Sequence, residues 1–281
     1  MMRRAATAAR HPRRALAAQL VWSQEGASLA RRYRLLNSSL IRWPCEIRWV
    51  AAFDAFVVDD GEASLIVPRK ARLWKYRDGV AQRLEALARE FGASDLPLNP
   101  SEPVIDCGAN VGEFSLWAAR TTGCRVIAVE PDPVEFAALE RNLAPSGATA
   151  VHAGLWHEPG EMQIYLGNDR GDTTLIDPGG SPPTTTVRTV TLDALCLEVA
   201  PDGVIGLLKL EAEGAEPEIL AGAEETLRRT RFVTVDVGPE RGPARESTAP
   251  AVTTLLTDAG FRLRALVPSR PSMVFEASIG T

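Results

Sequence analysis

The sequence is poor in cysteine: Cys45, Cys107, Cys124 and Cys196 are the only four in 281 residues. No two of them have C-x-x-C spacing, and their density is far below that of small disulfide-stabilised folds. This scarcity argues against a disulfide scaffold and against a structural zinc site. We therefore expect reduced thiols in a cytoplasmic protein.

The sequence also lacks long apolar runs and an excess of basic charge. No stretch reaches the roughly 20 apolar residues that a membrane-spanning helix needs, so we expect no transmembrane segment. The formal net charge is -5, whereas a nucleic-acid-binding surface needs basic side chains to neutralise phosphates. We therefore expect no nucleic-acid partner. With 45% hydrophobic and 24% charged residues, the chain has the composition of a globular protein with a sizeable core.

Basic charge is concentrated at the N-terminus. Residues 1–34 contain eight arginines and a single acidic residue, Glu25, so the rest of the chain is acidic. Such an arm has three interpretations: a transit peptide, a helix that touches an anionic surface, or a packed amphipathic helix. We favour the last, because the apolar run 15–22 is short, contains Gln19 and lacks a convincing small-residue cleavage site.

The first 95 residues predict a small accessory region. Apolar residues at broadly helical spacing indicate a helix over 11–36. The turn at 59–62 contains Asp-Gly between the β-prone runs 56–58 and 64–67, which is a strong hairpin signal. A second helix is expected over 80–91, because Gly92 and two prolines follow it.

From residue 103 onward, short apolar runs alternate with helical stretches, which is the pattern of βαβ units around a parallel sheet. We therefore predict an α/β domain over 96–281 with a doubly wound, mostly parallel, seven-stranded, Rossmann-like sheet. Its strands are expected at 103–107, 125–130, 148–155, 204–211, 232–237, 262–267 and 273–277, and its helices at 112–120, 133–143, 217–229 and 249–259. Segments 162–166 and 186–190 are expected to form an inserted pair of strands, and 238–247 an irregular loop at the ligand edge of the sheet.

The sharpest functional signal is VIDCGANVG at residues 104–112, an apolar strand that ends in an acid and continues into a glycine-rich turn before a helix. Gly108 and Gly112 allow a tight turn and the close approach of a ligand. Asp106 would repel the pyrophosphate of a dinucleotide. It suits a ligand with an ammonium group and no phosphate, such as S-adenosylmethionine.

The second signal is Glu130, which ends the next apolar strand and lies 18 residues after Gly112. An acid at about this distance from the glycine turn is placed to accept hydrogen bonds from ribose hydroxyls. Both NAD and S-adenosylmethionine carry a ribose, so Glu130 predicts a nucleoside ligand without choosing between them. Asp132 is explained more simply as the cap of the following helix.

The third signal is LLKLEAEGAEPE at residues 207–218, an apolar strand that delivers several carboxylates to the same edge of the sheet. Strand alternation predicts Lys209, Glu211 and Glu213 on one side. Glu216 and Glu218 lie near a helix start, where acids are favoured for structural reasons. Glu211 and Glu213 are therefore the better candidates for chemistry.

Together, these three blocks resemble the signature of FkbM-family methyltransferases over approximately residues 100–270. The resemblance implies a class I methyltransferase fold, S-adenosylmethionine as the methyl donor, and usually a hydroxyl acceptor on a small molecule, secondary metabolite or saccharide. It further implies that Glu130 holds the donor ribose. At position 211 the chain has Glu, whereas the family more often has Asp. The residues predicted to bind the donor are Asp106, Cys107, Gly108, Ala109, Asn110, Gly112, Glu130 and Pro131.

A hydroxyl acceptor needs a base within hydrogen-bond reach or a metal that lowers its pKa. The three histidines are His11, in the basic arm, His152, in a predicted strand, and His157, just beyond it. We therefore expect a carboxylate base, with Glu211 and Glu213 first and Asp236 next. Mg²⁺ held by Glu213, Asp236 and water is an alternative that we favour less, and we predict no metal ligands.

Two other functions are also compatible with the sequence. An NAD-dependent oxidoreductase shares the fold and the ribose acid, but Asn110 stands where G-x-G-x-x-G needs glycine, and no Tyr-x-x-x-Lys pair is present. A non-catalytic binding protein on the same fold need not keep Asp106, Glu130 and Glu213 together. The identity of the acceptor and of the base, and the oligomeric state, a homodimer included, stay open from sequence.

Overall fold

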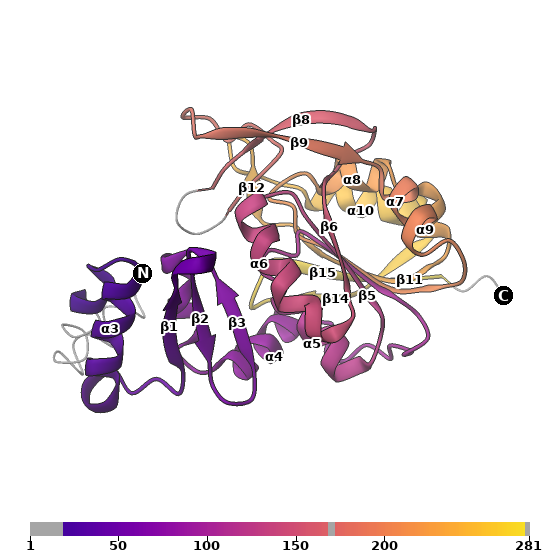
Figure 1. The fold of residues 1–281 in the computed structure, drawn as a ribbon. Coiled ribbons are helices and arrows are strands. Elements are labelled where there is room, and N and C mark those ends of the chain that lie inside the picture. The colour runs from indigo at the N-terminus through magenta and orange to yellow at the C-terminus, as the bar shows by residue number, and fades with distance from the viewer. Residues whose placement is uncertain (1–18, 168–171, 279–281) are drawn as a thin grey trace. The chain divides into compact units, whose positions relative to one another are not determined.

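A computed structural model describes residues 19–167 and 172–278 of the chain (Figure 1). It contains two compact units, Met1–Arg83 and Leu84–Thr281. Residues 11–18 of the helix predicted over 11–36, together with His11, lie outside the described residues. No helix in the described part of the chain is long and apolar enough to cross a membrane.

The first unit contains a helix and a three-stranded antiparallel sheet. Helix α3 (Gly26–Leu36) continues into a π-helical turn (Asn37–Ile41), and strands β1 (Glu46–Val50), β2 (Ala55–Asp59) and β3 (Ser64–Val67) pair in that order. The predicted hairpin is β2–β3, and Asp60 Oδ1 accepts hydrogen bonds from Glu62 N at 3.0 Å and Ala63 N at 2.8 Å across its turn. Strand β1 was not predicted, although its apolar and charged residues alternate. Two 3₁₀ segments, Ala51–Phe53 and Lys70–Tyr76, complete the unit.

The second unit is built on a seven-stranded sheet of order β14-β15-β11-β10-β4-β5-β6. Strand β15 pairs antiparallel with both of its neighbours, and the other pairs are parallel. The predicted doubly wound, mostly parallel sheet is therefore confirmed. Its strands are β4 (Val104–Cys107), β5 (Val126–Glu130), β6 (Thr149–His152), β10 (Ile205–Leu210), β11 (Thr230–Asp236), β14 (Phe261–Val267) and β15 (Ser272–Ala277).

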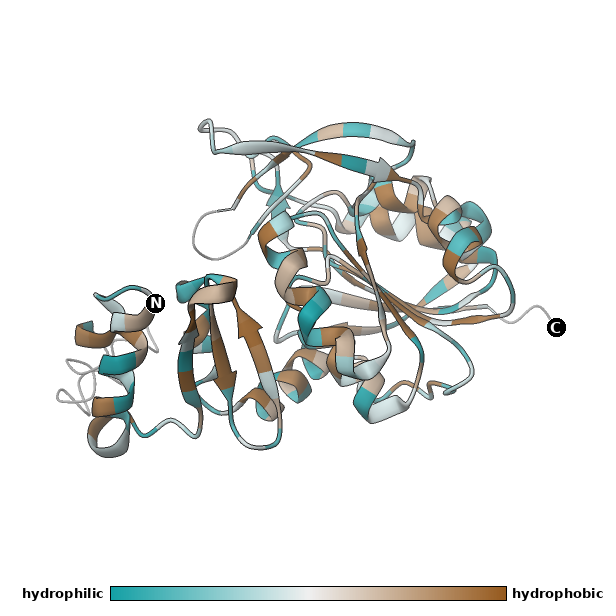
Figure 2. Cartoon of the chain, in the orientation of Figure 1, coloured by the Kyte–Doolittle hydropathy of each residue, from teal (hydrophilic) through white to brown (hydrophobic). Residues whose placement is uncertain are grey.

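Helices flank this sheet. They are α4 (Val80–Glu90), which spans the boundary between the units, α5 (Glu113–Thr122), α6 (Pro133–Leu143), α7 (Leu192–Val199), α8 (Glu216–Ala221), α9 (Glu224–Arg228) and α10 (Ala249–Asp258), with a 3₁₀ turn at Ala144–Ser146. The sheet strands are predominantly hydrophobic, whereas the flanking helices alternate hydrophobic and hydrophilic residues (Figure 2). Helix α6 begins where predicted, because Asp132 Oδ1 caps it by accepting from Val134 N at 2.9 Å.

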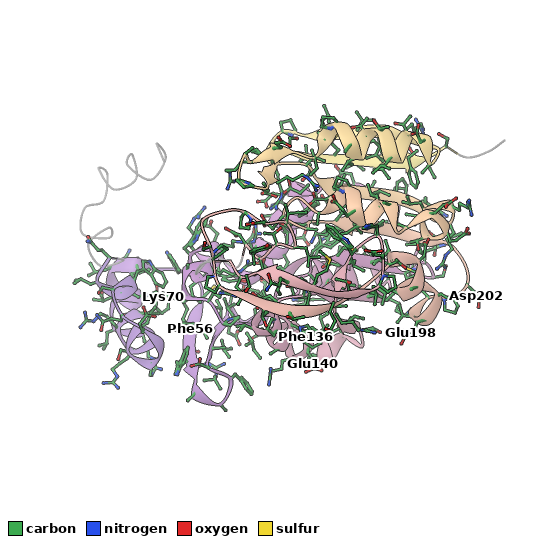
Figure 3. All side chains as sticks on the ribbon, turned by 90° about the horizontal axis from the view of Figure 1, so that it is seen from above. Phe56, Lys70, Phe136, Glu140, Glu198 and Asp202 are labelled. Atoms are coloured by element: carbon green, nitrogen blue, oxygen red, sulfur yellow. The ribbon has the colours of Figure 1, made fainter. Side chains whose placement is uncertain are left out.

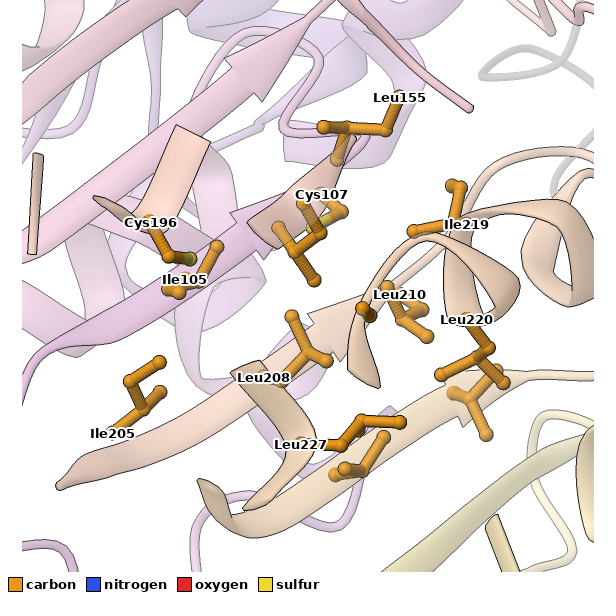
Figure 4. Packing of buried hydrophobic residues seen from close by; sticks show 14 of the residues in the cluster. Ile105, Cys107, Leu155, Cys196, Ile205, Leu208, Leu210, Ile219, Leu220 and Leu227 are labelled. Carbon is orange, nitrogen blue, oxygen red and sulfur yellow. The ribbon is translucent and has the colours of Figure 1, made fainter. Parts of the chain in front are cut away.

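The main core lies on one face of the sheet. Alternate residues of the central strands, such as Cys107 and Leu208, pack against Ile219, Leu220 and Leu227 of helices α8 and α9 (Figure 4). The opposite face carries Phe91, Phe114 and Trp117, and the ring of Phe114 contacts the rings of the other two. All four cysteines are buried free thiols, as expected.

Five details of the second unit differ from the predicted elements. The helix predicted over 217–229 is two helices, α8 and α9, interrupted at Gly222 and Ala223, and helix α7 was not predicted. The strand predicted over 148–155 divides at Ala153, because β6 pairs with β5 whereas β7 (Gly154–Leu155) pairs with β9. Strands β8 (Gly160–Tyr165) and β9 (Thr184–Val190) complete a separate three-stranded sheet with β7. The loop predicted to be irregular contains a short ribbon, β12 (Pro239–Arg241) and β13 (Glu246–Ser247).

Candidate functional site

The candidate site lies at the carboxyl edge of the seven-stranded sheet. Strands β4 and β10 are neighbours in the sheet, and the chain continues outward from them in opposite directions, to β5 and to β11. In open α/β sheets, ligands bind at the carboxyl ends of the strands where the strand order reverses in this way. The three sequence signals therefore meet at one place in the fold.

The glycine turn after β4 is packed directly against the end of β10. Gly108 has φ +72°, and a Cβ atom built on it would lie 1.8 Å from the backbone oxygen of Glu211. Gly112, with φ +91°, precedes helix α5, and a Cβ there would lie 2.9 Å from Leu139 Cδ1. Gly108 therefore requires glycine for packing within the protein, whatever a ligand demands in addition, whereas at Gly112 the positive φ is the stronger reason, because Leu139 Cδ1 is the end of a flexible side chain.

Glu130 is held by the backbone of two neighbouring turns. Its Oε2 accepts a hydrogen bond from Asn110 N at 2.7 Å, and its Oε1 accepts one from Asp132 N at 2.8 Å. The side chain is buried, and burial raises the pKa of Glu130 to about 8, against the opposing effect of these two donors. A carboxylate has about four lone-pair directions, so two stay available for the hydroxyls of a bound ligand.

A buried lysine ties the glycine turn to β10. Lys209 Nζ donates to the carbonyl oxygen of Gly108 at 2.9 Å and forms an ion pair with Asp106 Oδ1 at 2.9 Å. Asp106 is fully buried and accepts a second hydrogen bond from Ser115 Oγ at 2.7 Å. Burial alone would lower the pKa of Lys209, but the carboxylates of Asp106 and Glu211 outweigh it and raise that pKa. The predicted side-by-side placement of Lys209 and Glu211 is present, because Nζ lies 3.1 Å from Glu211 Oε2.

A second cation, Arg270, joins the ends of β10 and β11. It lies in the turn between β14 and β15, where its guanidinium pairs with Glu211 Oε1 and, at 2.5 Å, with Asp236 Oδ2. It also lies 3.7 Å from Glu90 Oε2 and stacks over the ring of Phe91 with a centroid distance of 4.7 Å. Glu211 is therefore held between two cations, and Asp236 is fixed by Arg270 and by Gly238 N at 2.9 Å.

Two further carboxylates at this edge have strongly raised pKa values. Burial raises the pKa of Glu213 to about 9, with smaller contributions from Glu240, Glu211, Asp172 and Glu216. Burial likewise raises the pKa of Glu240 to about 7. Such shifts are typical of functional carboxyl groups, although structural clusters also produce them.

The structure places the other candidates as follows. Cys107 and Ala109 are buried beside Gly108, and Pro131 lies between Glu130 and Asp132. His152 lies in β6, where its ring stacks on Phe136 at 4.7 Å.

His157 contacts Trp156, edge to face at 5.4 Å. Within residues 19–167 and 172–278, no group of three or more His, Cys, Asp or Glu side chains is arranged to hold a metal ion.

Sequence reasoning missed Arg270, Glu240 and Glu90. Arg270 is separated from Glu211 by 59 positions and lies in a turn without a motif, so nothing local points to it. Glu240 does have a signal, since an acid in the loop after a parallel strand lies at the ligand edge of the sheet.

Comparison with known proteins identifies the family of this chain. Residues 106–263 match the model of the methyltransferase FkbM domain, which is more than half of the chain. The methyltransferase sdnD of Sordaria araneosa is 31% identical over 206 residues, a match that covers 61% of this chain and 77% of sdnD.

Two further relatives carry names that specify oxygen. The 31-O-demethyl-FK506 methyltransferase FkbM of Streptomyces tacrolimicus is 31% identical, covering 60% of this chain and 75% of that protein. The 2-O-methyltransferase NoeI of Sinorhizobium fredii is 24% identical, covering 60% and 76% respectively. With the glycine turn, Glu130 and the acidic block after β10 in one place, the chain belongs to the FkbM methyltransferase family.

Proposed function

We propose that this methyltransferase transfers a methyl group from S-adenosylmethionine to a hydroxyl oxygen of a small molecule, such as a secondary metabolite or a saccharide. The observation that carries the proposal is Glu130, whose two oxygens are oriented by backbone donors at the carboxyl edge of the sheet. Two relatives are a 2-O-methyltransferase and a 31-O-demethyl-FK506 methyltransferase by name, which supports oxygen as the acceptor atom.

The residues at this edge fit the chemistry of the donor. S-adenosylmethionine carries a ribose diol, an ammonium group and a positively charged sulfur. Glu130 supplies acceptor lone pairs for the diol. The edge carries more carboxylates than cations among its described residues, and its cations Lys209, Arg270 and Arg241 are committed to ion pairs. An acidic edge of this kind favours a cationic donor over a pyrophosphate.

The remaining predicted donor-binding residues act in different ways in this proposal. Gly108 and Asn110 carry the turn beside the donor, and Asn110 presents its backbone N–H to Glu130 with φ +51°. Asp106 is fully buried, so it acts through Lys209, which holds the Gly108 carbonyl in place. The turn is thereby fixed before any ligand binds, which favours positioning as the source of rate acceleration.

Bound S-adenosylmethionine supplies an electrophilic methyl group, and the protein must supply a base for the acceptor hydroxyl. Glu211 and Asp236 were predicted for this role, but both pair with Arg270, and Glu211 also pairs with Lys209. Adjacent cations favour the ionised form of a carboxylate and weaken it as a base. Glu213 differs from both, because burial raises its pKa to about 9, so it is mostly protonated at neutral pH and suits hydrogen-bond donation to the acceptor better than removal of the hydroxyl proton.

The alternative readings gain no specific support. A pyrophosphate of NAD would face the carboxylates around the end of β10. Mg²⁺ would have to compete with Arg270 for Asp236, so a metal-free mechanism is preferred. A binding protein without turnover would still need the donor site, and we assign that site to Leu84–Thr281, with the first unit as an accessory region.

The test is calorimetric titration of the full chain with S-adenosylmethionine, S-adenosylhomocysteine and NAD. We expect dissociation constants on the order of micromolar for the two adenosyl ligands and a loss of about 100-fold in Glu130→Ala, because two hydrogen bonds from the ribose hydroxyls are lost. Glu140→Ala is a suitable control, since Glu140 projects outward from the surface of α6 (Figure 3). Binding of NAD alone, or of no nucleotide, would exclude the proposed donor.

A further inference from the structure

A bidentate ion pair fastens the β12–β13 ribbon to helix α8, and a further hydrogen bond fastens it to the turn after β10. Arg241, at the end of β12, donates from Nη2 to Glu218 Oε1 at 2.6 Å and from Nη1 to Glu218 Oε2 at 2.8 Å. The same Nη1 donates to the carbonyl oxygen of Gly214 at 2.6 Å. The backbones are also in contact, because a Cβ atom built on Gly214 would lie 2.7 Å from Arg241 Cα. Planar, bidentate pairs of this kind fix orientation as well as distance.

This clamp, defined by Arg241, Glu218 and Gly214, controls the position of the preceding residue, Glu240. The Glu240 side chain folds back over Gly238, since a Cβ built on Gly238 would lie 3.5 Å from Glu240 Cδ and 3.1 Å from Asp236 Oδ1. Glu240 therefore points toward the carboxyl end of β11 and not away from the protein. Its charge interacts with Glu211, Glu216 and Asp236, and it is in turn the strongest charged neighbour of Glu213.

We propose that Glu240 is the general base of the methyl transfer, that Glu213 lies beside it as a protonated hydrogen-bond donor to the acceptor, and that the clamp positions the pair. This inference rests on the proposed function, since it assumes S-adenosylmethionine at the same edge. In the step, the acceptor oxygen forms a bond to the methyl carbon, and the carbon–sulfur bond breaks. Its electron pair stays on sulfur, and the hydroxyl proton passes to the Glu240 carboxylate.

The titration of the two groups supports this division of roles. Burial, helped by the neighbouring carboxyl groups of Asp236, Glu211 and Glu216 and opposed by Arg270, raises the pKa of Glu240 to about 7. Burial, helped by Glu240, Glu211, Asp172 and Glu216, raises the pKa of Glu213 to about 9. Near pH 8, Glu240 is mostly ionised and Glu213 mostly protonated. Two carboxyl groups whose environments separate their pKa values in this way have separate acid and base roles.

The inference can be tested without knowing the acceptor, by using the donor analogue sinefungin. Sinefungin carries a protonated amine where S-adenosylmethionine carries the methylated sulfur, so a carboxylate close to the transferred methyl group binds it more tightly than S-adenosylhomocysteine. At pH 8, we expect Glu240→Gln to weaken sinefungin about 10-fold, the usual scale for one charge-assisted hydrogen bond, and to change S-adenosylhomocysteine less than about twofold. Glu213→Gln should change either ligand less than about threefold, because Gln resembles the protonated side chain.

Matched controls separate position from general charge and stability. Glu198→Gln removes one exposed carboxylate from α7 (Figure 3) and should leave both affinities unchanged. Arg241→Ala should reduce the preference for sinefungin severalfold while S-adenosylhomocysteine still binds. Arg228→Ala removes an exposed arginine paired with Glu224 and Glu225, and it should leave the preference for sinefungin unchanged.

The outcomes are distinguishable. If wild-type protein binds neither adenosyl ligand, the proposed donor site fails. If both ligands bind and Glu240→Gln leaves their affinity ratio unchanged, the donor site stands and the assignment of Glu240 is overturned. The preference of the wild type for sinefungin should also rise through pH 7 as Glu240 ionises, and a flat ratio between pH 6 and pH 8 would contradict the assignment equally.

Discussion

The candidate site has two halves that hold their carboxylates by different means. In the glycine-turn half, which comprises residues 106–112 and Glu130, the acid Glu130 is held by backbone N–H groups from turns close to it in sequence. In the ion-pair half, which comprises Glu211, Glu213, Asp236, Glu240 and Arg270, the acids Glu211 and Asp236 are held by a guanidinium from a distant turn. Lys209 connects the two halves, since it contacts both Gly108 and Glu211.

This difference teaches what each half can tolerate. Backbone donors cannot be removed by changing a side chain, so the glycine-turn half depends on the path of the main chain. The ion-pair half depends on side-chain charges, and removing one partner leaves another charge buried without compensation. Substitutions should therefore disrupt the first half through sterics and the second through electrostatics.

The largest effect is expected at Gly108. Alanine at this position has to move the backbone oxygen of Glu211, because its Cβ would lie 1.8 Å from that atom. We expect Gly108→Ala to lose at least about 4 kcal/mol of unfolding free energy, or to yield no folded protein. Urea denaturation followed by circular dichroism measures this loss.

Gly147 provides a matched control, since its φ of +71° is almost that of Gly108 at +72° and nothing lies within 4 Å of the added Cβ. Gly147→Ala should cost only the left-handed backbone conformation, about 1 kcal/mol. Equal losses at the two positions would show that backbone strain, and not packing against β10, explains the requirement for glycine at position 108.

The next effect in size concerns Lys209, which bridges the two halves. Lys209→Met leaves the fully buried Asp106 without its cation and removes the donor to the Gly108 carbonyl. We expect a loss of about 3–5 kcal/mol of unfolding free energy, the usual cost of breaking a buried pair. Lys70→Met, which removes the more exposed pair with Glu25, should cost less than about 1 kcal/mol.

A double variant sharpens this test. Asp106→Asn combined with Lys209→Met removes both charges, so it should recover part of the stability that Lys209→Met loses. If the double variant is no more stable than Lys209→Met alone, the loss comes from the hydrogen bonds to the turn and not from the unpaired charge of Asp106.

The two halves also differ in how far sequence reasoning reaches them. The glycine turn and Glu130 lie in short contiguous motifs at the ends of apolar strands, so local spacing predicts that they meet at one edge. The contacts of Arg270 depend on tertiary packing across 59 positions, and no local pattern encodes them. For the same reason the sequence suggested Glu211 as a base, since strand alternation already placed Lys209 on the same side but the second cation, Arg270, becomes visible only in the fold.

The fold itself was largely predictable, because the central strands of the sheet, β4, β5, β10 and β11, are predominantly apolar runs. The missed elements are those with weak or mixed patterns. Helix α7 did carry a start signal, as Thr191 Oγ1 accepts from Ala194 N at 3.0 Å, but its short length hid the periodicity. The division between β6 and β7 was not visible, because both segments are β-prone and only their pairing partners differ.

The smallest expected effect is a difference between the two halves in how the free energy of unfolding depends on pH. Burial raises the pKa of Glu130 to about 8 and that of Glu213 to about 9, both from an ordinary value of 4.5. Between 4.5 and the raised value, the folded state binds a proton that the unfolded state has released. The contribution of each carboxyl group's proton binding to the free energy of unfolding is therefore fully present below pH 4.5. It is lost as the pH rises to about 8 for Glu130 and to about 9 for Glu213.

Between pH 8 and pH 9, the Glu213 contribution should fall by no more than about 1 kcal/mol of unfolding free energy and that of Glu130 by less, while the buried Cys45, Cys107 and Cys196, whose pKa values are also raised, add a fall that all the variants share. Urea midpoints at these two pH values should therefore differ more in the wild type and in Glu130→Gln than in Glu213→Gln. Glu198→Gln should follow the wild type, because Glu198 is exposed. A wild-type slope that persists unchanged in Glu213→Gln would mean that the raised proton affinity resides in the glycine-turn half or outside the site, and Glu213 would then be ionised when an acceptor arrives.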